Sequence, residues 1–293
     1  MNLLPPVVLV HGLWHGSWCW SPVTERLASL GIPSVAVDLD GHGLKARSPQ
    51  ARLRRPFDPA AYATEPSPVA GVTASSAAET LIAQLRRIGN GRPCVLVAHS
   101  MGGVVATAAA EQAPDLISEI VYLSAFAPVN GNPAAHYITE PENAGEMVTG
   151  LLVADPTQVG ALRQDTDDHN RLLLLQEVFY GDVDDDIATA AISLLSPDGP
   201  AGIAGQPVPV TPQRYGAIPH TYMVCLQDKV VPVALQRRFI DEIDAVSAHP
   251  TTVVELDTSH SPFLSRPGEL ADKIASVYRA QRSQEHQAES VRS

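Results

Sequence analysis

Short runs of consecutive apolar residues alternate along the chain with longer stretches whose apolar residues recur at helical spacing. Strands that are buried on both faces of a parallel sheet are nearly continuous in apolar residues, and such strands alternate with helices along the chain. The pattern therefore predicts an α/β fold with a mostly parallel six-stranded sheet flanked by helices. The expected strands are 7–10, 34–37, 94–98, 117–123, 221–226 and 252–256, and the expected helices are 22–30, 76–88, 103–112, 233–243 and 269–282.

Two segments interrupt this alternation. Residues 44–73 contain Pro49, Pro56, Pro59, Pro66 and Pro68, which exclude a long helix. A connection of this length suggests the rim of a site or a mobile flap.

The second interruption, 128–219, has helical patterns at 171–179 and 185–195 and no good strand. We expect a helical cap at 128–219, inserted into a core formed by 1–127 and 220–283, with a flexible tail at 284–293.

Composition narrows the functional classes. The chain has 293 residues and a formal net charge of −12 at pH 7, which argues against nucleic acid and anionic membrane surfaces as partners. No segment approaches the roughly 18–20 apolar residues of a membrane span, and the first residues lack a basic leader. We expect a cytoplasmic protein whose partner is a small-molecule substrate, with a homodimer left open. Cys19, Cys94 and Cys225 suggest no disulfide framework.

The segment 94–110 carries the strongest chemical signal. An apolar run ends at Ala98, His99-Ser100-Met101 follow, and two glycines precede a helical stretch. A serine at the apex of a tight strand–turn–helix presents its hydroxyl at the top of the sheet. Alanine stands at 98 where the usual G-x-S-x-G pattern has glycine, and it is small enough to preserve the turn. Ser100 is the candidate nucleophile.

An acid and a base follow in the order that this kind of site requires. A serine hydroxyl needs a base, and the base needs an acid that orients it. Asp228 ends the predicted strand 221–226, and His260 follows the last predicted strand. The other usual position for the acid, after the strand 117–123, reads Ser124-Ala125-Phe126 and has no carboxylate. We therefore assign Asp228 as the acid and His260 as the base.

Attack on a carbonyl creates an oxyanion, which needs preorganised donors. We assign the backbone N–H groups of Leu13, in the loop after the first strand, and of Met101, directly after the nucleophile. Trp14, Phe126 and Phe263 are the candidate side chains for a substrate pocket. Apolar residues within 147–179, including Leu152 and Phe179, suggest that this pocket is apolar.

His11 and His15 invite a metal interpretation, but no third ligand has suitable spacing. We expect both to fix the loop by hydrogen bonds, His99 to be structural, and the protein to use neither a metal nor a cofactor. Residues 181–186 superficially resemble a calcium loop but lack its spaced ligands, so they are better explained as a helix start.

Together these residues resemble the α/β-hydrolase superfamily, and within it the group of plant methyl esterases, hydroxynitrile lyases and bacterial pyrethroid hydrolases. The resemblance rests on HGLWHGSWCW (11–20), AHSMGG (98–103), CLQDKVVP (225–232) and His260. It implies a fold without the superfamily's first two strands, an active site under a helical cap, and the triad Ser100–Asp228–His260. The lyases typically carry threonine in place of Gly12 and lysine directly after the histidine, where this chain has Ser261. A cyanohydrin lyase needs a cation for the departing cyanide, so Ser261 favours a hydrolase.

The sequence thus predicts a serine esterase that cleaves a small or medium apolar carboxylic ester through an acyl-enzyme. One alternative is non-hydrolytic chemistry on the same scaffold, namely a lyase, an elimination or cyclisation catalyst, or a cofactor-free oxygenase. There His260 would be the base and no acyl-serine would form. A second alternative is a receptor-like protein that binds a ligand without turnover.

Overall fold

A computed structural model describes the backbone of residues 5–292 and the side chains as far as residue 281. Six strands form one sheet in the order β2-β1-β3-β4-β7-β8, and every neighbouring pair is parallel. This confirms the predicted sheet. The strands are β1 (Val7–Val10), β2 (Ser34–Val37), β3 (Cys94–His99), β4 (Ile117–Leu123), β7 (His220–Cys225) and β8 (Thr252–Leu256).

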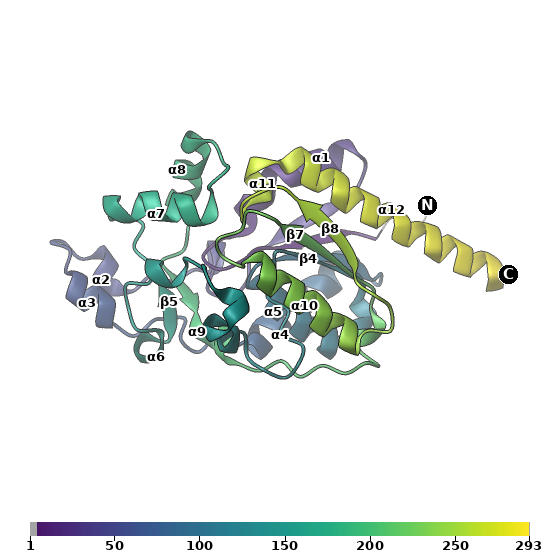
Figure 1. Cartoon of the computed structure of the whole chain (residues 1–293), viewed down its shortest axis with the longest axis horizontal. Helices are drawn as coiled ribbons and strands as arrows, with labels where there is room; N and C mark the ends of the chain where they lie inside the picture. Colours follow the sequence, from purple (N-terminus) through teal and green to yellow (C-terminus); the bar gives the residue numbers. More distant parts are fainter. Residues whose placement is uncertain (1–4, 293) are drawn as a thin grey trace.

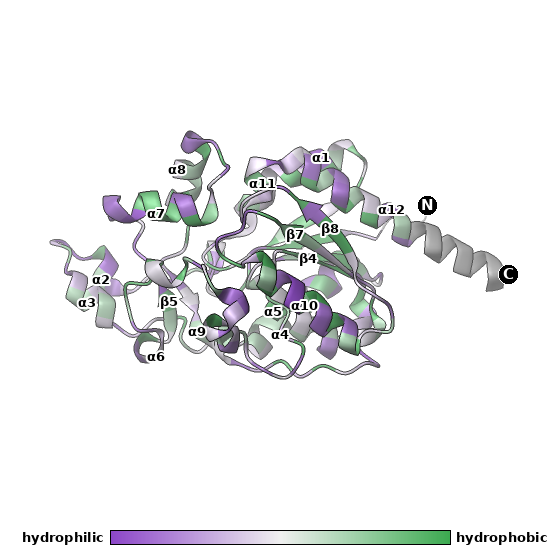
Figure 2. Cartoon of the chain, viewed as in Figure 1, coloured by the Kyte–Doolittle hydropathy of each residue, from purple (hydrophilic) through white to green (hydrophobic). Residues whose placement is uncertain are grey.

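Helices cover both faces of this sheet (Figure 1). One face packs against α1 (Ser21–Ser29), α11 (Pro262–Ser265) and α12 (Pro267–Arg292), and the other against α4 (Ala74–Gly89), α5 (Gly102–Gln112) and α10 (Val233–Val246). Side chains alternate between the faces of a strand. Val7 and Leu9 accordingly join the core under α1 and α12, whereas Val8 and Val10 join the core under α4 and α5. Figure 2 shows the resulting hydrophobic strands between helices that carry hydrophilic residues.

Residues 128–219, here called the inserted segment, connect β4 to β7. The predicted helices are present as α7 (His169–Phe179) and α8 (Asp185–Ser193), and Asp184 caps α8 by accepting from the N–H groups of Asp186 and Ile187. The other elements are short: η4 (Ala134–Thr139), η5 (Pro141–Asn143), η6 (Thr149–Leu151), α6 (Pro156–Val159), α9 (Ala201–Gly205) and η7 (Tyr215–Ala217).

The expectation that this segment lacks strands is wrong. β5 (Ala161–Arg163) pairs antiparallel with β6 (Asp198–Pro200). Each strand has only three residues, and their sequences include Arg163 and Asp198, so neither reads as an apolar run. These two side chains form a fully buried ion pair with two hydrogen bonds of 2.7 and 2.8 Å. This ion pair, and not an apolar contact, connects the two strands through their side chains.

Residues 44–73 contain short helices, consistent with their prolines: η2 (Gly43–Lys45), α2 (Gln50–Leu53) and α3 (Pro59–Thr64). These residues lie beside the inserted segment (Figure 1) and are bonded to it. The Arg163 guanidinium donates to the carbonyls of Tyr62 and Glu65, and the Tyr62 hydroxyl donates to the Gln164 carbonyl at 2.6 Å. Residues 44–73 are therefore anchored to the inserted segment by buried hydrogen bonds.

The C-terminal helix is longer than expected. α12 continues to Arg292 through most of the expected flexible tail at 284–293, and residue 293 lies outside the described residues. Two further 3₁₀ turns, η1 (Ser17–Trp20) and η3 (Pro114–Leu116), complete the core. None of the described helices is long and apolar enough to cross a membrane. The three cysteines are free and buried.

Candidate active site

Ser100 occupies a sharp turn between β3 and α5. Its φ is +53°, in the left-handed region that L-residues rarely adopt. The two following glycines allow close approach, because a Cβ at Gly102 would lie 2.3 Å from the His11 carbonyl oxygen. A Cβ at Gly103 would lie 2.4 Å from the carbonyl oxygen of Phe126. The strained turn and its glycines match the geometry expected for a nucleophile elbow.

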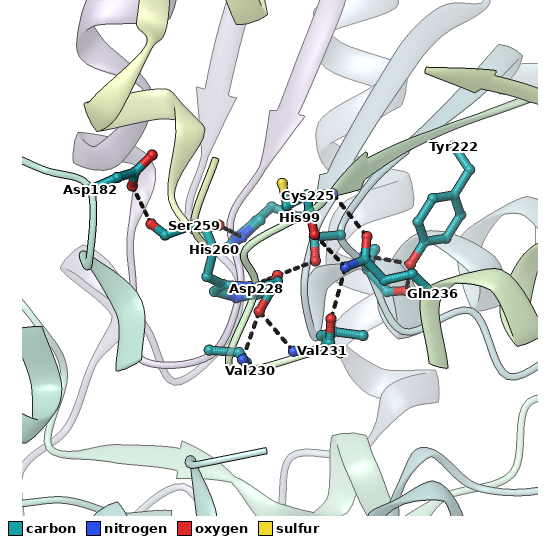
Figure 3. A network of polar contacts seen from close by, with 12 residues as sticks. His99, Asp182, Tyr222, Cys225, Asp228, Val230, Val231, Gln236, Ser259 and His260 are labelled. Atoms are coloured by element: carbon teal, nitrogen blue, oxygen red, sulfur yellow. Dashed lines mark hydrogen bonds and ion pairs between the residues drawn. The ribbon is translucent and has the colours of Figure 1, made fainter. Parts of the chain in front are cut away.

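Asp228 and His260 come together from the ends of β7 and β8. The His260 Nδ1 lies 2.6 Å from Asp228 Oδ2, and both side chains are fully buried. The other carboxylate oxygen accepts from the N–H groups of Val230 (2.6 Å) and Val231 (2.9 Å), and the Ser124 hydroxyl donates to Oδ2. Figure 3 shows Asp228 between these partners. Because a carboxylate accepts at Nδ1, the proton of a neutral His260 is on Nδ1 and its Nε2 is unprotonated.

The His260 Nε2 is available as a base. It is buried and has no hydrogen-bond partner among the described residues, Ser100 included. The contact between a nucleophile and its base is often long without substrate and shortens when substrate binds. Ser100 itself lines a cavity that could hold a substrate.

His99, next to Ser100, supports the loop that carries His260. Its Nε2–H donates to the His260 carbonyl at 2.9 Å, and the two rings lie 4.4 Å apart between centroids. Burial lowers the pKa of His99 well below its ordinary value. His99 is therefore neutral at physiological pH and its contacts are structural, as the sequence suggested.

Two backbone amides lie in the loops beside Ser100, that of Leu13 in the loop after β1 and that of Met101 in the turn between β3 and α5. Leu13 and Met101 line the same cavity as Ser100. Within residues 5–281, neither a carbonyl nor a side chain accepts from the Leu13 or Met101 amide. Two amides without acceptors beside the serine can bind an oxyanion.

His11 and His15 hold this loop in shape. The His11 ring donates from Nδ1 to the Gly12 carbonyl at 2.8 Å and accepts at Nε2 from the Leu39 N–H. The His15 ring donates from Nδ1 to the Leu13 carbonyl at 2.8 Å and accepts at Nε2 from the Tyr180 hydroxyl. Burial lowers the pKa of each ring to about 3, so both are neutral. The described residues contain no group of three or more His, Cys, Asp or Glu side chains that could hold a metal.

The cavity at Ser100 has a volume of about 470 Å³ and is almost entirely apolar. Phe126 lines it as predicted, and so do Leu152 and Phe179. The remaining lining comes mainly from the short elements of the inserted segment: Ala134, Ala135, Ile138, Asn143, Glu146, Val148, Thr149, Pro156, Thr157, Leu162, Ala201, Ala204 and Gly205, with Val230 from the acid loop.

Trp14 and Phe263 differ from their prediction, because neither is among the described residues that line this cavity. Trp14 is fully buried, and its indole N–H donates to the Leu162 carbonyl at 2.7 Å. Phe263 belongs to the core under α1 and α12, where its ring packs against His99 and Trp20.

Sequence reasoning missed two residues that support the acid. Ser124 follows β4, where the sequence search looked for a carboxylate, and its hydroxyl instead reaches Asp228. Gln236 of α10 is fully buried and bonds to Cys225 N–H, Cys225 carbonyl and Val231 carbonyl, which fixes the loop that carries Asp228 (Figure 3). In the sequence, Gln236 could have been found as a glutamine on the core face of the amphipathic helix α10.

Most of the chain is similar in sequence to known proteins. The sequence model described as the Alpha/beta hydrolase family matches residues 7–273. The chain belongs to the alpha/beta hydrolase family. It is 28% identical to Methylesterase 9 of Arabidopsis thaliana over 284 residues, which cover 92% of this chain and 96% of the relative. It is 27% identical to the pyrethroid hydrolase of Sphingobium wenxiniae over 269 residues, covering 92% and 86%.

Solved structures agree with this family. The crystal structure of a pyrethroid hydrolase with BIF superposes with a TM-score of 0.76 at 26% sequence identity, covering 95% of this chain and 99% of the other. A fold shared over nearly the full length of both chains includes the inserted segment as well as the sheet.

Proposed function

We propose that this chain, a carboxylic ester hydrolase by its relatives, cleaves a small or medium apolar ester through an acyl-serine on Ser100. The observation that carries the proposal is the hydrogen bond between Asp228 and His260 Nδ1, which leaves the buried Nε2 without a hydrogen-bond partner among the described residues. The family and its named methylesterase and pyrethroid hydrolase relatives support ester hydrolysis.

In the acylation step, the Ser100 Oγ attacks the ester carbonyl carbon while His260 Nε2 takes the hydroxyl proton. Asp228 stabilises the imidazolium that forms and keeps its Nδ1–H directed at the carboxylate. Collapse of the tetrahedral intermediate breaks the bond to the alcohol, and His260 returns the proton to the departing oxygen. Water then attacks the acyl-enzyme by the same steps and releases the acid.

The oxyanion of both intermediates would lie on the amides of Leu13 and Met101. Both are free of acceptors within residues 5–281, so no existing hydrogen bond must break when the charge develops. Met101 directly precedes α5, whose N-terminal end favours negative charge.

The cavity supports an apolar substrate of limited size. Its walls are mostly Ala, Val, Leu, Ile and Phe side chains, and no lysine or arginine is among the described residues that line it. Burial of an apolar acyl or alcohol group contributes roughly 25 cal/mol per Å² of area removed from water. An anionic group would lose its hydration there without gaining a cationic partner among these lining residues.

The same absence of a lining cation favours hydrolysis over cyanohydrin cleavage, which needs a cation for the leaving cyanide. Ser261 stands directly after His260, where the similar lyases carry lysine. A Cβ at Gly12 would also lie 2.6 Å from the Ser100 Cβ, so the threonine of those lyases does not fit this loop.

The test is pre-steady-state kinetics with p-nitrophenyl acetate. We expect a burst of about one p-nitrophenol per chain and an acetylated Ser100 peptide after acid quench. Ser100→Ala should abolish both. Ser29→Ala should retain them, because Ser29 is exposed and its hydroxyl donates to the Arg26 carbonyl. Turnover that survives in Ser100→Ala would show that another group is the nucleophile.

A further inference from the structure

Trp14 holds a strained backbone beside the proposed oxyanion donor. Its φ is +63°, in a region that costs an L-residue of this size of order 1–3 kcal/mol. Such a conformation persists only where the surroundings impose it. Trp14 directly follows Leu13 and shares a peptide bond with it, so a fixed Trp14 constrains the path of the loop at Leu13.

Two hydrogen bonds from the inserted segment impose this conformation. The Trp14 indole N–H donates to the carbonyl of Leu162 in β5 at 2.7 Å, and the Ser196 N–H donates to the Trp14 carbonyl at 2.7 Å. The side chain of Trp14 is thus held by a residue of β5, and its main chain by Ser196, which lies just before β6. The indole also packs edge-on against Phe179.

The small sheet also packs directly against Leu13. A Cβ at Gly199, in β6, would lie 2.1 Å from Leu13 Cδ1 and 3.4 Å from Trp14 Cδ1. A side chain at position 199 would therefore have to displace the Leu13 side chain. On the other side of Leu13, the His15 Nδ1–H bond fixes its carbonyl.

We propose that Trp14 is a positioning residue, through which the sheet β5–β6 sets the Leu13 amide for oxyanion binding. The proposal rests on the proposed function, because it needs an oxyanion at Ser100. It predicts an effect on the transition state and on tetrahedral adducts, and no effect on binding of the planar ester.

The test uses Trp14→Phe, which removes the indole N–H and keeps an aromatic ring. We expect kcat for a p-nitrophenyl ester to fall about 10–100-fold with KM within about twofold. This is less than the ~10²–10³ expected when an oxyanion donor is removed altogether. The Ki of an alkyl trifluoromethyl ketone, which adds to a catalytic serine to give a tetrahedral oxyanion, should rise by a similar factor.

Trp20→Phe is the matched control. Trp20 is fully buried in the neighbouring η1, and its indole N–H has no acceptor among the described residues. Trp20→Phe should leave kcat and the ketone Ki within about threefold of wild type. Gly199→Ala is the second variant, and it should show the same fall in kcat and the same rise in the ketone Ki. It tests the proposal even if Trp14→Phe fails to fold.

Several outcomes overturn the proposal. If kcat and the ketone Ki are unchanged in both folded variants, Leu13 is not positioned through Trp14. If KM rises while kcat is constant, Trp14 acts in substrate binding instead. A wild-type chain that gives no burst overturns the proposed function together with this inference, whereas a normal burst with unchanged Ki in the variants overturns only this inference.

Discussion

Gly12 lies so close to Ser100 that a Cβ at position 12 would stand 2.6 Å from the Ser100 Cβ and 3.1 Å from its Oγ. Real side chains do not approach so closely, so either the loop or the serine would have to move. The loop that carries one proposed oxyanion donor and the turn that carries the nucleophile are therefore in direct contact.

Gly12→Ala should lower kcat/KM by about 10²-fold or more, because displacement of this loop or of Ser100 misaligns the reacting groups. The measurement is steady-state kinetics on the folded variant, checked by circular dichroism. Gly71→Ala is the control, since a Cβ at Gly71 has no atom within 4 Å. Equal activity of the two variants would contradict the close packing at Gly12.

Ser124→Ala should lower kcat about 10–100-fold with little change in KM. The variant removes a hydrogen bond to the Asp228 oxygen that also pairs with His260, and a hydrogen bond to a charged group contributes about 1.5–3 kcal/mol. Asp228 would then be held less firmly against His260 Nδ1. The exposed Ser29→Ala provides the comparison, and an unchanged kcat in Ser124→Ala would remove Ser124 from the catalytic support.

His42 gives the fold a measurable sensitivity to acid. Burial lowers its pKa from 6.5 to about 4 in the folded chain. Below pH 6.5 the unfolded chain therefore takes up a proton that the folded chain does not, so the free energy of unfolding falls as the pH is lowered from about 6.5 to about 4. Below pH 4 both states are protonated and this contribution is fully lost.

His42→Asn should make the pH dependence of the unfolding free energy shallower by up to about 1.4 kcal/mol per pH unit in that range. Urea unfolding at pH 4.5, 5.5 and 6.5 measures the slope. His249→Asn, at an exposed position, should leave the slope as in wild type. Parallel slopes for His42→Asn and wild type would exclude His42 as a source of the acid sensitivity.

Asp198→Asn should destabilise the fold by about 3–5 kcal/mol, because it leaves the fully buried Arg163 guanidinium without its counter-charge. Arg163→Met combined with Asp198→Leu removes both charges and should recover part of that loss. Chemical unfolding of the three proteins provides the comparison. A single variant as stable as wild type would mean that the pair carries little of the packing between 44–73 and the small sheet.

The four inner strands could be predicted because burial on both faces leaves nearly continuous apolar runs. The edge strands β2 and β8 are largely exposed, and they could be predicted from their place in the alternation of strands and helices. The positions of Ser100, Asp228 and His260 could be predicted because each follows such a run at its carboxyl end, where loops of a parallel sheet converge. The structure pairs Asp228 with His260 and places Ser100 on the cavity.

The rest depends on contacts that local patterns do not contain. The Arg163–Asp198 pair joins residues 35 apart in the sequence, and the Trp14 indole reaches Leu162, 148 residues away. The cavity walls come from short 3₁₀ and α turns of the inserted segment, which have no periodicity to read. The residue type of Trp14 suits a pocket wall, but its hydrogen bond to the Leu162 carbonyl directs the indole into the protein.

The inserted segment bonds to three loops at the end of the sheet. Tyr180 donates to His15, and Glu177 accepts from Lys229 beside Asp228. Asp182 accepts from Ser259 beside His260, as Figure 3 shows. The same segment lines most of the cavity. Chimeras that exchange residues 128–219 with a relative would consequently inherit the rate as well as the selectivity of the donor. In directed evolution for a new substrate, substitutions at positions that touch both the cavity and one of these loops would change selectivity and rate together.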